Sequence, residues 1–546
     1  MMNKQKTVIA CALGECVHVA GVVRFLQLAE QAGWRTVFLG PAVTIEEAIK
    51  RAETENADML AVSYRLTPET GERLLAQFAE NADYLREKGT QFAFGGTPPV
   101  ADRAEKIGFF DKVFYGSETY EDTLAFLRGE SGKIKTESHY PQTTLSRIRW
   151  KAPYPILRHH FGLPTMQATI DGIKHIAEAK VLDVISLGID QDAQANFFHP
   201  ERQELRKTGA GGVPVRSAQD YRDLYAASRR GNYPLMRTYS GTDDFLELAQ
   251  MYIKTINIAW PAIPLFWFNQ MDGRGPWDLA GSIREHQKVM QFYGTRGIPL
   301  EVNESHHWGM RDAPDVLFVV SSYLSAYNAR AYGVHDYIAQ MMFNSPPGTS
   351  DAMDLAKMDA VLSMCAELES EKFHIWRQTR TGLLSYPLEE NAARAHLAAS
   401  IYNQMALNPH IVHIVGHSEA HHAATASDII DASLMARRAI ENALSGQANM
   451  LHDPIIEKRK NHLIKEARIT LQVIKENAKA GCSDPLTDAE CLAAAVKNGI
   501  MDAPHLKNNP FAAGTISTRI INGACEAVDD SGNIISEAQR LANYLE

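Results

Sequence analysis

Short apolar runs alternate with helical segments along the whole chain, and this alternation is the feature that most constrains the fold. Over the first 130 residues, β-rich runs occupy residues 7–13, 35–39, 59–63, 91–94 and 112–115, and the segments between them have helical periodicity. Strands that alternate with helices form parallel sheets with helices on both faces. The sequence therefore predicts a doubly wound α/β domain over residues 1–130, with ligand sites at the carboxyl ends of its strands.

A second series of strand and helix patterns follows. Seven β-like runs each end in polar residues and lead into a helical segment; they span residues 181–190, 234–240, 262–268, 298–303, 337–343, 373–379 and 410–415. Polar groups after successive strands are typical of a (β/α)8 TIM-type barrel, whose site lies at the carboxyl face of the strands. An eighth strand is expected among the earlier or later segments, and two smaller α/β domains are the alternative. Residues 131–160 have little periodicity and are predicted to form a linker, so that the barrel with a C-terminal extension spans residues 161–546.

The composition excludes several classes of partner. The net charge is -10 and no Lys/Arg block occurs, which argues against nucleic acid. No apolar run approaches the roughly 20 residues of a membrane span. The six cysteines are sparse and form no Cys-x-x-Cys pair, as expected for free thiols in a reducing cytoplasm. We therefore expect a cytoplasmic protein whose partner is neither nucleic acid nor a membrane.

Short motifs occur where the strands of the first domain are expected to end. Residues 22–62, 41 in number, separate Gly21 from Ser63, and residues 67–94, 28 in number, separate Leu66 from Gly95. Glycines at such points let a backbone approach a ligand closely. The candidate cofactor-binding residues of these motifs are Cys16, His18, Gly21, Ser63, Leu66, Gly95, Gly96 and Gly116.

At these intervals the motifs resemble the Asp-x-His-x-x-Gly, Ser-x-Leu and Gly-Gly signature of cobalamin-binding domains that bind the cofactor with its own base displaced. The resemblance implies that His18 is the lower ligand of the cobalt ion, a role that suits an imidazole. Leu66 lies one place later than in the family. Cys16 stands where the family has an aspartate that orients the histidine, and a thiol is a poorer acceptor than a carboxylate, although Glu15 could substitute. A flavodoxin-like domain that binds no cofactor is the alternative.

The barrel region is similar to the large subunit of glutamate (methylaspartate) mutase, an adenosylcobalamin-dependent enzyme, over about residues 186–526. The likeness is carried by Ser-Leu-Gly-Ile-Asp at 186–190, Arg-Thr-Tyr-Ser-Gly-Thr-Asp at 237–243 and Gly-Ile-Met-Asp-Ala-Pro at 499–504. It implies that Glu304 is catalytic and that Glu419 contacts the adenosyl ribose. In that family the cobalamin domain is normally a separate subunit, whereas here both parts are fused. The resemblance also suggests a homodimer.

Other residues of the barrel region depart from that family. Three arginines hold the two carboxylates of glutamate in the family, and Gln194 and Lys288 stand at two of their places. We therefore expect a small carboxylic or amino acid other than glutamate as substrate. Asp190 and Asp192 either face the site or cap the next helix. The candidate catalytic residues are Glu304, His306, His307 and Arg237. The two histidines would serve as acid or base groups, and Arg237 would pair with a carboxylate.

Together the two resemblances predict an adenosylcobalamin-dependent radical isomerase, a carbon-skeleton mutase that acts on a small-molecule acid. A corrinoid methyltransferase, which also combines this cofactor with a barrel, is the enzymatic alternative. A cobalamin-binding sensor or carrier without isomerase activity is the alternative of a different class.

Overall fold

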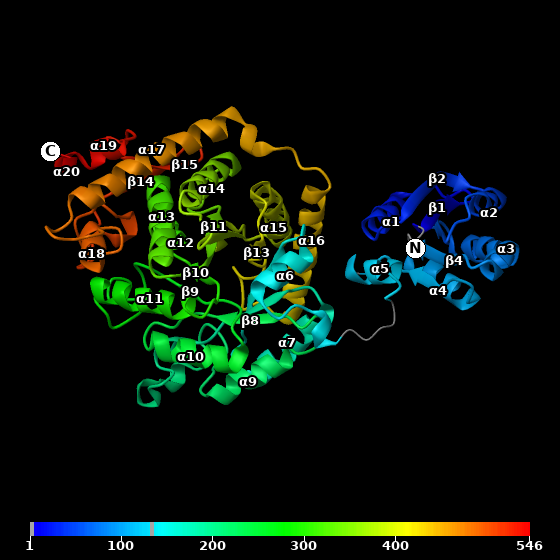
Figure 1. Ribbon diagram of the computed structural model, residues 1–546, viewed down its shortest axis with the longest axis horizontal. Helices are drawn as coiled ribbons and strands as arrows, with labels where there is room; N and C mark the ends of the chain where they lie inside the picture. The colour runs from blue at the N-terminus through cyan, green and yellow to red at the C-terminus, as the bar shows by residue number, and fades with distance from the viewer. Residues whose placement is uncertain (1–4, 119, 131–135, 546) are drawn as a thin grey trace. The chain divides into compact units, whose positions relative to one another are not determined.

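The computed structural model describes residues 5–118, 120–130 and 136–545, and the chain divides into two compact units, Met1–Lys135 and Thr136–Glu546 (Figure 1). Residues 131–135 of the predicted linker lie outside the described residues. Among the described helices, none is long and apolar enough to cross a membrane.

The first unit is a five-stranded parallel sheet with the strand order β2-β1-β3-β4-β5. Apolar clusters cover both faces, as expected for a sheet between two helical layers. This order confirms the predicted doubly wound α/β fold. The strand order reverses between β1 and β3, and such sheets bind ligands at that switch point. Its elements are β1 (Thr7–Leu13), α1 (Ala20–Gln31), β2 (Arg35–Val43), α2 (Ile45–Thr54), β3 (Met59–Tyr64), α3 (Pro68–Glu87), β4 (Gln91–Gly96), α4 (Pro98–Ile107), β5 (Lys112–Phe114) and α5 (Tyr120–Leu127).

The second unit is an eight-stranded parallel sheet with the order β8-β7-β6-β13-β12-β11-β10-β9. A parallel bridge between Tyr239 and Ala262 joins β8 to β9, the strands at the two edges, and so brings the sheet close to a closed barrel. This confirms the predicted (β/α)8 type of fold. The strands are β6 (Ile156–Phe161), β7 (Val184–Leu187), β8 (Leu235–Thr238), β9 (Ala262–Ile263), β10 (Leu300–Val302), β11 (Asp336–Phe343), β12 (His374–Thr381) and β13 (Ile411–His413).

A helix follows each strand and packs on the outside of the barrel (Figure 1). These helices are α7 (Met166–Ala179), α9 (Ala218–Ala227), α10 (Phe245–Ile256), α11 (Leu279–Gly294), α13 (Asp315–Ala331), α14 (Asp351–Ala366), α15 (Glu390–Gln404) and α16 (Ala426–Leu444). The C-terminal extension adds α17 (Pro454–Glu476), which packs across α13 and α14, then α18 (Ala489–Lys497), the hairpin β14 (Ser517–Ile521) and β15 (Ala524–Val528), and the short helices α19 (Glu537–Arg540) and α20 (Ala542–Leu545).

The eighth strand lies in the segment that the sequence assigned to a linker. Helix α6 (Thr144–Lys151) and strand β6 both fall within residues 136–161, and β6 pairs with β7 and β13. The second unit thus begins earlier than residue 161. The pattern was not recognised because the inward positions of β6 carry Arg158 and His160 instead of apolar residues, so the expected alternation is missing.

A buried ion cluster fixes the extension to the barrel helices. Lys357 Nζ on α14 lies 2.9 Å from Asp354 Oδ1 and 3.1 Å from Asp315 Oδ1 on α13. Asp315 Oδ2 also lies 3.0 Å from Arg459 Nη2 on α17. The Lys357 side chain is 1% exposed. Removal of its charge would leave Asp354 without a counter-charge, and Asp315 with Arg459 alone, in a medium of low dielectric constant.

We therefore expect Lys357→Met to lower the free energy of unfolding by about 3–5 kcal/mol. Lys460→Met is the matched control, because its ion pair with Asp359 is partly exposed and is expected to contribute less than about 1 kcal/mol. Denaturation followed by tryptophan fluorescence reports mainly on the second unit, since Trp34 is the only tryptophan of the first. Equal losses in both variants would contradict the assignment.

Candidate functional site

The loop after β1 presents His18 at the switch point of the first sheet. Residues 14–19 connect β1 to α1, and His18 is exposed there. It is the only histidine among residues 1–130 of the sequence. Its Nδ1 lies 3.9 Å from Cys16 Sγ, which leaves Nε2 as the atom able to bind a metal.

Cys16 is fully buried beneath this histidine, in the apolar cluster that covers one face of the sheet. Its amide donates to the carbonyl oxygen of Leu13 (3.1 Å), and its carbonyl oxygen accepts from the amide of Ala42 (3.0 Å). The thiol therefore occupies the orienting position that the resemblance gives to an aspartate. Because sulfur is a weak acceptor, it holds the imidazole less firmly than a carboxylate would.

Ser63 and Gly95 lie side by side at the carboxyl ends of β3 and β4. Ser63 Oγ is buried and has no hydrogen-bond partner among the residues that the structure describes. A Cβ added at Gly95 would find its nearest neighbour 4.0 Å away, whereas one at Gly96 would lie 2.8 Å from the ring of Phe94. The packing of Phe94 therefore requires a glycine at position 96. Ser63 offers a polar atom to a ligand, and Gly95 offers free space.

The remaining predicted residues of this domain surround the same strand ends. A Cβ at Gly21, in the first turn of α1, would meet no atom within 4 Å. Leu66 is 39% exposed after β3, and Gly116 after β5 has a φ of 86°, which favours glycine. With an exposed imidazole, an orphaned buried hydroxyl and open glycines, these residues fit a cobalamin bound with its own base displaced.

The weak Cys16 partner leads to a test. Cys16→Asp supplies a carboxylate acceptor to His18 Nδ1 and is expected to strengthen the histidine–cobalt bond, raising cobalamin affinity by about tenfold or more. Cys16→Ala, which removes the acceptor, is expected to lower it. Titration of the full-length variants with cobalamin, followed by absorption, measures both affinities. An affinity that is the same in all three proteins would show that Cys16 does not orient His18.

In the second unit, a hydrogen-bonded polar layer crosses the barrel interior above an apolar floor. Arg158 Nε donates to Gln378 Oε1 (2.7 Å) and its Nη1 to Ser186 Oγ (2.9 Å). Glu301 on β10 lies 3.7 Å from Arg158 Nη2 and 3.4 Å from Arg237 Nη2. We call Arg158, Ser186, Arg237, Glu301 and Gln378 the middle layer, and all five are at most 2% exposed. The floor below it contains Ile156, Val184, Leu235, Trp260, Ile338 and Ile411.

Arg237, a predicted catalytic residue, thus lies in the middle layer with Glu301 as its carboxylate partner. Burial alone would raise the pKa of Glu301, but Arg237 and Arg158 hold it below the ordinary value, so the glutamate is ionised. Trp260 Nε1 donates to the same carboxylate (2.8 Å). The layer is closed by its own contacts and forms the base of the site.

Above the middle layer lies a second set of inward side chains, which we call the upper ring: His160, Tyr239, Arg380 and His413. The first three are partly exposed, and His413 is buried. The first three lie two residues beyond Arg158, Arg237 and Gln378 and therefore face the same way, and His413 pairs with Arg380 between strands. The rings of His160 and Tyr239 stack at 5.1 Å, and His160 meets His413 edge-on at 4.8 Å.

The imidazoles at this face of the barrel are neutral. Burial, with Arg158 and Arg380 nearby, lowers the pKa of His160 and His413 well below the ordinary value. Both nitrogens of His413 are buried without a hydrogen-bond partner among the described residues. A buried polar atom without a hydrogen-bond partner in the protein commonly binds a water or a ligand. The upper ring was not predicted from the sequence. Pairs of polar residues at i and i+2 within β-like runs, such as Arg158 and His160, are a signal for it.

Glu304 lies at the carboxyl end of β10, where it is the N-cap of the short helix α12 (Ser305–Gly309), and it is fully buried. Its Oε2 accepts from the amides of Leu265 (2.6 Å) and Phe266 (3.0 Å), and its Oε1 from Trp308 Nε1 (2.7 Å). Burial raises its pKa to about 7, despite these three hydrogen bonds. Glu304 therefore anchors the β9 loop and is close to half-protonated at neutral pH.

His306 and His307 follow on the same helix. Their rings lie 4.2 Å apart, and His306 Nδ1 lies 3.3 Å from Gln340 Nε2 on β11. His307 Nε2 is buried without a hydrogen-bond partner among the described residues. Burial lowers the pKa of both imidazoles well below the ordinary value, so that each is neutral and able to donate one hydrogen bond and accept another.

The raised pKa of Glu304 predicts a pH-dependent stability. In the unfolded chain this group titrates near its ordinary pKa of 4.5, so between about 4.5 and about 7 the native state binds more protons than the unfolded state. The stability from Glu304 is therefore fully present at low pH and is lost as pH rises through about 7, by roughly 3 kcal/mol. Unfolding at about pH 5 and about pH 8 should show a smaller loss in Glu304→Gln than in the parent protein. The exposed Glu371→Gln control should keep the full loss.

Other predicted positions are resolved by their contacts. Asp190 is the N-cap of α8 (Gln191–Ala195) and pairs with Arg216 (2.6 Å), so its role is capping. Asp192 accepts from the amide of Glu204 (2.9 Å). Glu419, after β13, accepts from the amide of Gly416 (2.9 Å) and is 22% exposed near the upper ring.

The two positions that replace family arginines do not join these residues. Gln194 Nε2 donates to the carbonyl oxygen of Ile189 (3.0 Å), and Lys288 is an exposed residue of α11 paired with Glu285. Neither lies in the middle layer or the upper ring.

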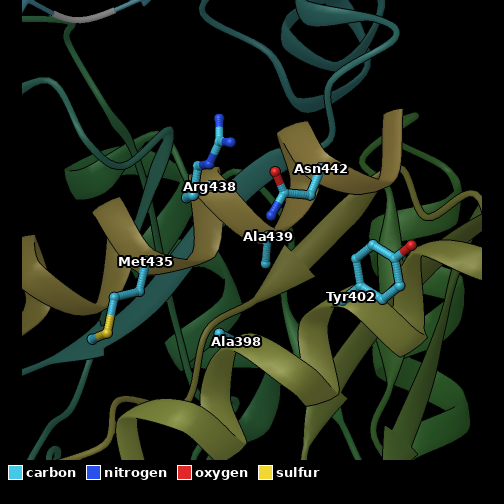
Figure 2. Close-up of a pocket in the computed structure, with 6 residues that line it drawn as sticks. All are labelled: Ala398, Tyr402, Met435, Arg438, Ala439 and Asn442. Atoms are coloured by element: carbon cyan, nitrogen blue, oxygen red, sulfur yellow. The ribbon is translucent and has the colours of Figure 1, made fainter. Parts of the chain in front are cut away.

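A pocket of about 260 Å³ between α15 and α16 is a separate feature of the barrel exterior. Figure 2 shows its lining side chains, which come from the C-terminal halves of both helices. These helices run antiparallel to the strands, so the pocket lies toward the amino ends of the strands, where barrels do not carry their sites. It is lined by Ala398, Tyr402, Met435, Arg438, Ala439 and Asn442.

Comparison with known families identifies the first unit. Residues 6–124 match the B12 binding domain family. The matched segment includes the His18 loop and the ends of β3 and β4. The chain therefore joins a domain that matches this family to an eight-stranded, barrel-like α/β domain. The predicted cobalamin-binding domain is confirmed. A comparison of the sequence with curated proteins gives no match.

Three solved structures have weak overall likeness. A cobalamin-binding protein from Desulfitobacterium hafniense DCB-2 is 19% identical with a TM-score of 0.21; the match covers 24% of this chain and 60% of that protein. A truncated 3-deoxy-D-arabino-heptulosonate 7-phosphate synthase from Thermotoga maritima is 11% identical, with a TM-score of 0.31 and coverage of 54% and 87%. A 2,3-dimethylmalate lyase of the PEP mutase/isocitrate lyase superfamily is 12% identical, with a TM-score of 0.28 and coverage of 61% and 99%. Likeness this weak carries no information on activity.

Proposed function

We propose that the protein is an adenosylcobalamin-dependent radical isomerase, a carbon-skeleton mutase that acts on a small carboxylic or amino acid other than glutamate. The observation that carries the proposal is the presence in one chain of a B12-binding domain with an exposed His18 and a barrel whose carboxyl-terminal face bears Glu304 and neutral imidazoles. The similarity of the barrel segment to glutamate mutase supports the same class.

On this proposal, His18 holds the cobalt ion, Ser63 and Gly95 receive the nucleotide tail, and Glu419 binds the adenosyl ribose. Adenosylcobalamin, when bound, would supply the radical chemistry by which substrate and product interconvert as isomers. The task of the chain is to bind and orient the substrate while it excludes water and other reactants.

The barrel residues suit that task. His307 and His413 offer unpaired nitrogens that form hydrogen bonds to a polar substrate without adding charge. Glu304, with a pKa of about 7, is able to hold or release a proton on a polar substrate group. The apolar floor and the closed middle layer keep water out from below.

The proposal is tested by absorption and electron paramagnetic resonance of the full-length protein with adenosylcobalamin. We expect a spectrum of cobalamin with its base displaced and a histidine bound, which is lost in His18→Ala and retained in His175→Ala, an exposed histidine of α7. A panel of small carboxylic and amino acids should then contain at least one that produces a cobalt(II)–radical signal.

Each other outcome identifies a different function. Absence of any cobalamin binding would refute the proposal. Cobalamin binding with methyl transfer, but without a radical signal from any acid, would establish a corrinoid methyltransferase. Tight binding with neither activity would establish a sensor or carrier, a role that the weak Cys16 partner of His18 would suit.

A further inference from the structure

Among the described residues, Arg380 differs from Arg158 and Arg237, the two arginines of the middle layer, in its lack of a counter-charge. Arg158 and Arg237 share Glu301 in the middle layer. Arg380, at the carboxyl end of β12, makes one long hydrogen bond, from Nε to the carbonyl oxygen of Thr381 (3.4 Å). Among the described residues, no carboxylate lies within 4.0 Å of its guanidinium group.

The acidic group that acts most strongly on Arg380 is already held elsewhere. Glu419 Oε1 accepts from the amide of Gly416 (2.9 Å) and lies 3.3 Å from His159 Nε2. The other members of the upper ring, His160, Tyr239 and His413, are uncharged. The upper ring therefore carries a single positive charge on a partly exposed side chain that faces the barrel axis.

A guanidinium group in a partly desolvated position is costly unless an anion pairs with it. The planar fork of arginine matches a carboxylate, which accepts two parallel hydrogen bonds from it. Arg380 is the one cation among the four members of the upper ring, so a second carboxylate would find no partner within it. Arg158 and Arg237 share Glu301 below, Lys288 lies on the barrel exterior, and Arg311 stacks on Trp267 and donates to the carbonyl oxygen of His307.

We propose that Arg380 is the substrate-carboxylate anchor and that the substrate presents one carboxylate to the upper ring, with an uncharged polar remainder against His160, Tyr239 and His413. This inference rests on the proposed function, since it names the substrate class of the same site. A monocarboxylic acid, or an acid whose other polar groups are neutral, fits the ring better than a dicarboxylic acid.

The test uses the full-length protein and three four-carbon probes: butyrate, butyramide and succinate. Binding is measured by calorimetry and by the fluorescence of the buried Trp267 and Trp308 near His307. Butyrate should bind saturably, butyramide should not, and succinate should bind more weakly than butyrate. Arg380→Gln should weaken butyrate binding about tenfold to a hundredfold, because a charged hydrogen-bonded pair is lost. Arg380→Lys should recover part of the affinity, because lysine restores the positive charge but not the planar fork of arginine.

Arg377→Gln is the matched control. Arg377 lies on the same strand, but its Nε donates to the carbonyl oxygen of Asn408, so its loss should leave butyrate affinity unchanged. The cobalamin spectrum and melting temperature of each variant verify folding. No measurable binding of butyrate, or equal affinity in Arg380→Gln and the parent, overturns the inference, as does tighter binding of succinate.

Failure of this inference is distinct from failure of the proposed function. If Arg380→Gln binds butyrate as tightly as the parent protein and the substrate-dependent radical signal is intact, the protein is a mutase that binds its acid through another residue. Arg380-dependent binding of butyrate without a radical signal would establish the acid-binding site and reject the isomerase.

Discussion

The Arg158–Glu301–Arg237 contact in the barrel interior is the interaction on which the site depends. Two guanidinium groups and one carboxylate are desolvated together. Their mutual attraction, with hydrogen bonds from Arg158 to Gln378 and Ser186 and from Trp260 to Glu301, offsets part of that cost. A carboxylate on β10 is thereby joined to arginines on β6 and β8, neither of which is a neighbour of β10 in the sheet order. The contact fills the interior with charged groups that pair with one another, and Gln378 Nε2 is the one side-chain atom of the middle layer that is buried without a hydrogen-bond partner among the described residues. The proposed site is therefore formed mainly by the residues above it.

Strand periodicity explains how the same sequence supplies both layers. Inward positions recur every second residue, so Arg158 and His160 face the barrel axis at successive heights, as do Gln378 and Arg380. The lower member of each pair meets partners from other strands and is closed off. The upper member lies where the strands end and the loops diverge, and it is partly exposed. A closed charged layer and an open ring above it follow from one alternation.

The sequence predicted the features that depend on local pattern and fixed spacing. The five strands of the first domain and seven of the eight barrel strands follow from periodicity, and the His18 loop from its intervals to Ser63 and Gly95. Strand β6 was missed because its inward residues, Arg158 and His160, replace the apolar ones that mark a strand. The pairing of Glu301 with Arg237 was also missed, since it depends on the stagger of strands around the barrel, which no local pattern encodes. The same limit applies to Lys288, which falls on the outside of α11 although it aligns with a family arginine.

The electrostatics of the two units differ in a way that suits their parts in the proposed reaction. His18 is exposed and rests on a buried thiol, a neutral and weakly accepting group, so its ring keeps freedom to adjust to a metal. The imidazoles of His160 and His413 lie near arginines, which together with burial keeps them neutral, and no carboxylate lies within 4.0 Å of either among the described residues. A neutral imidazole is a poor acid near pH 7 and adds no charge, so it is better suited to holding a polar substrate than to driving proton transfer. Arg380 is then the one group of the upper ring that can select a substrate by charge, while the surrounding rings select it by shape.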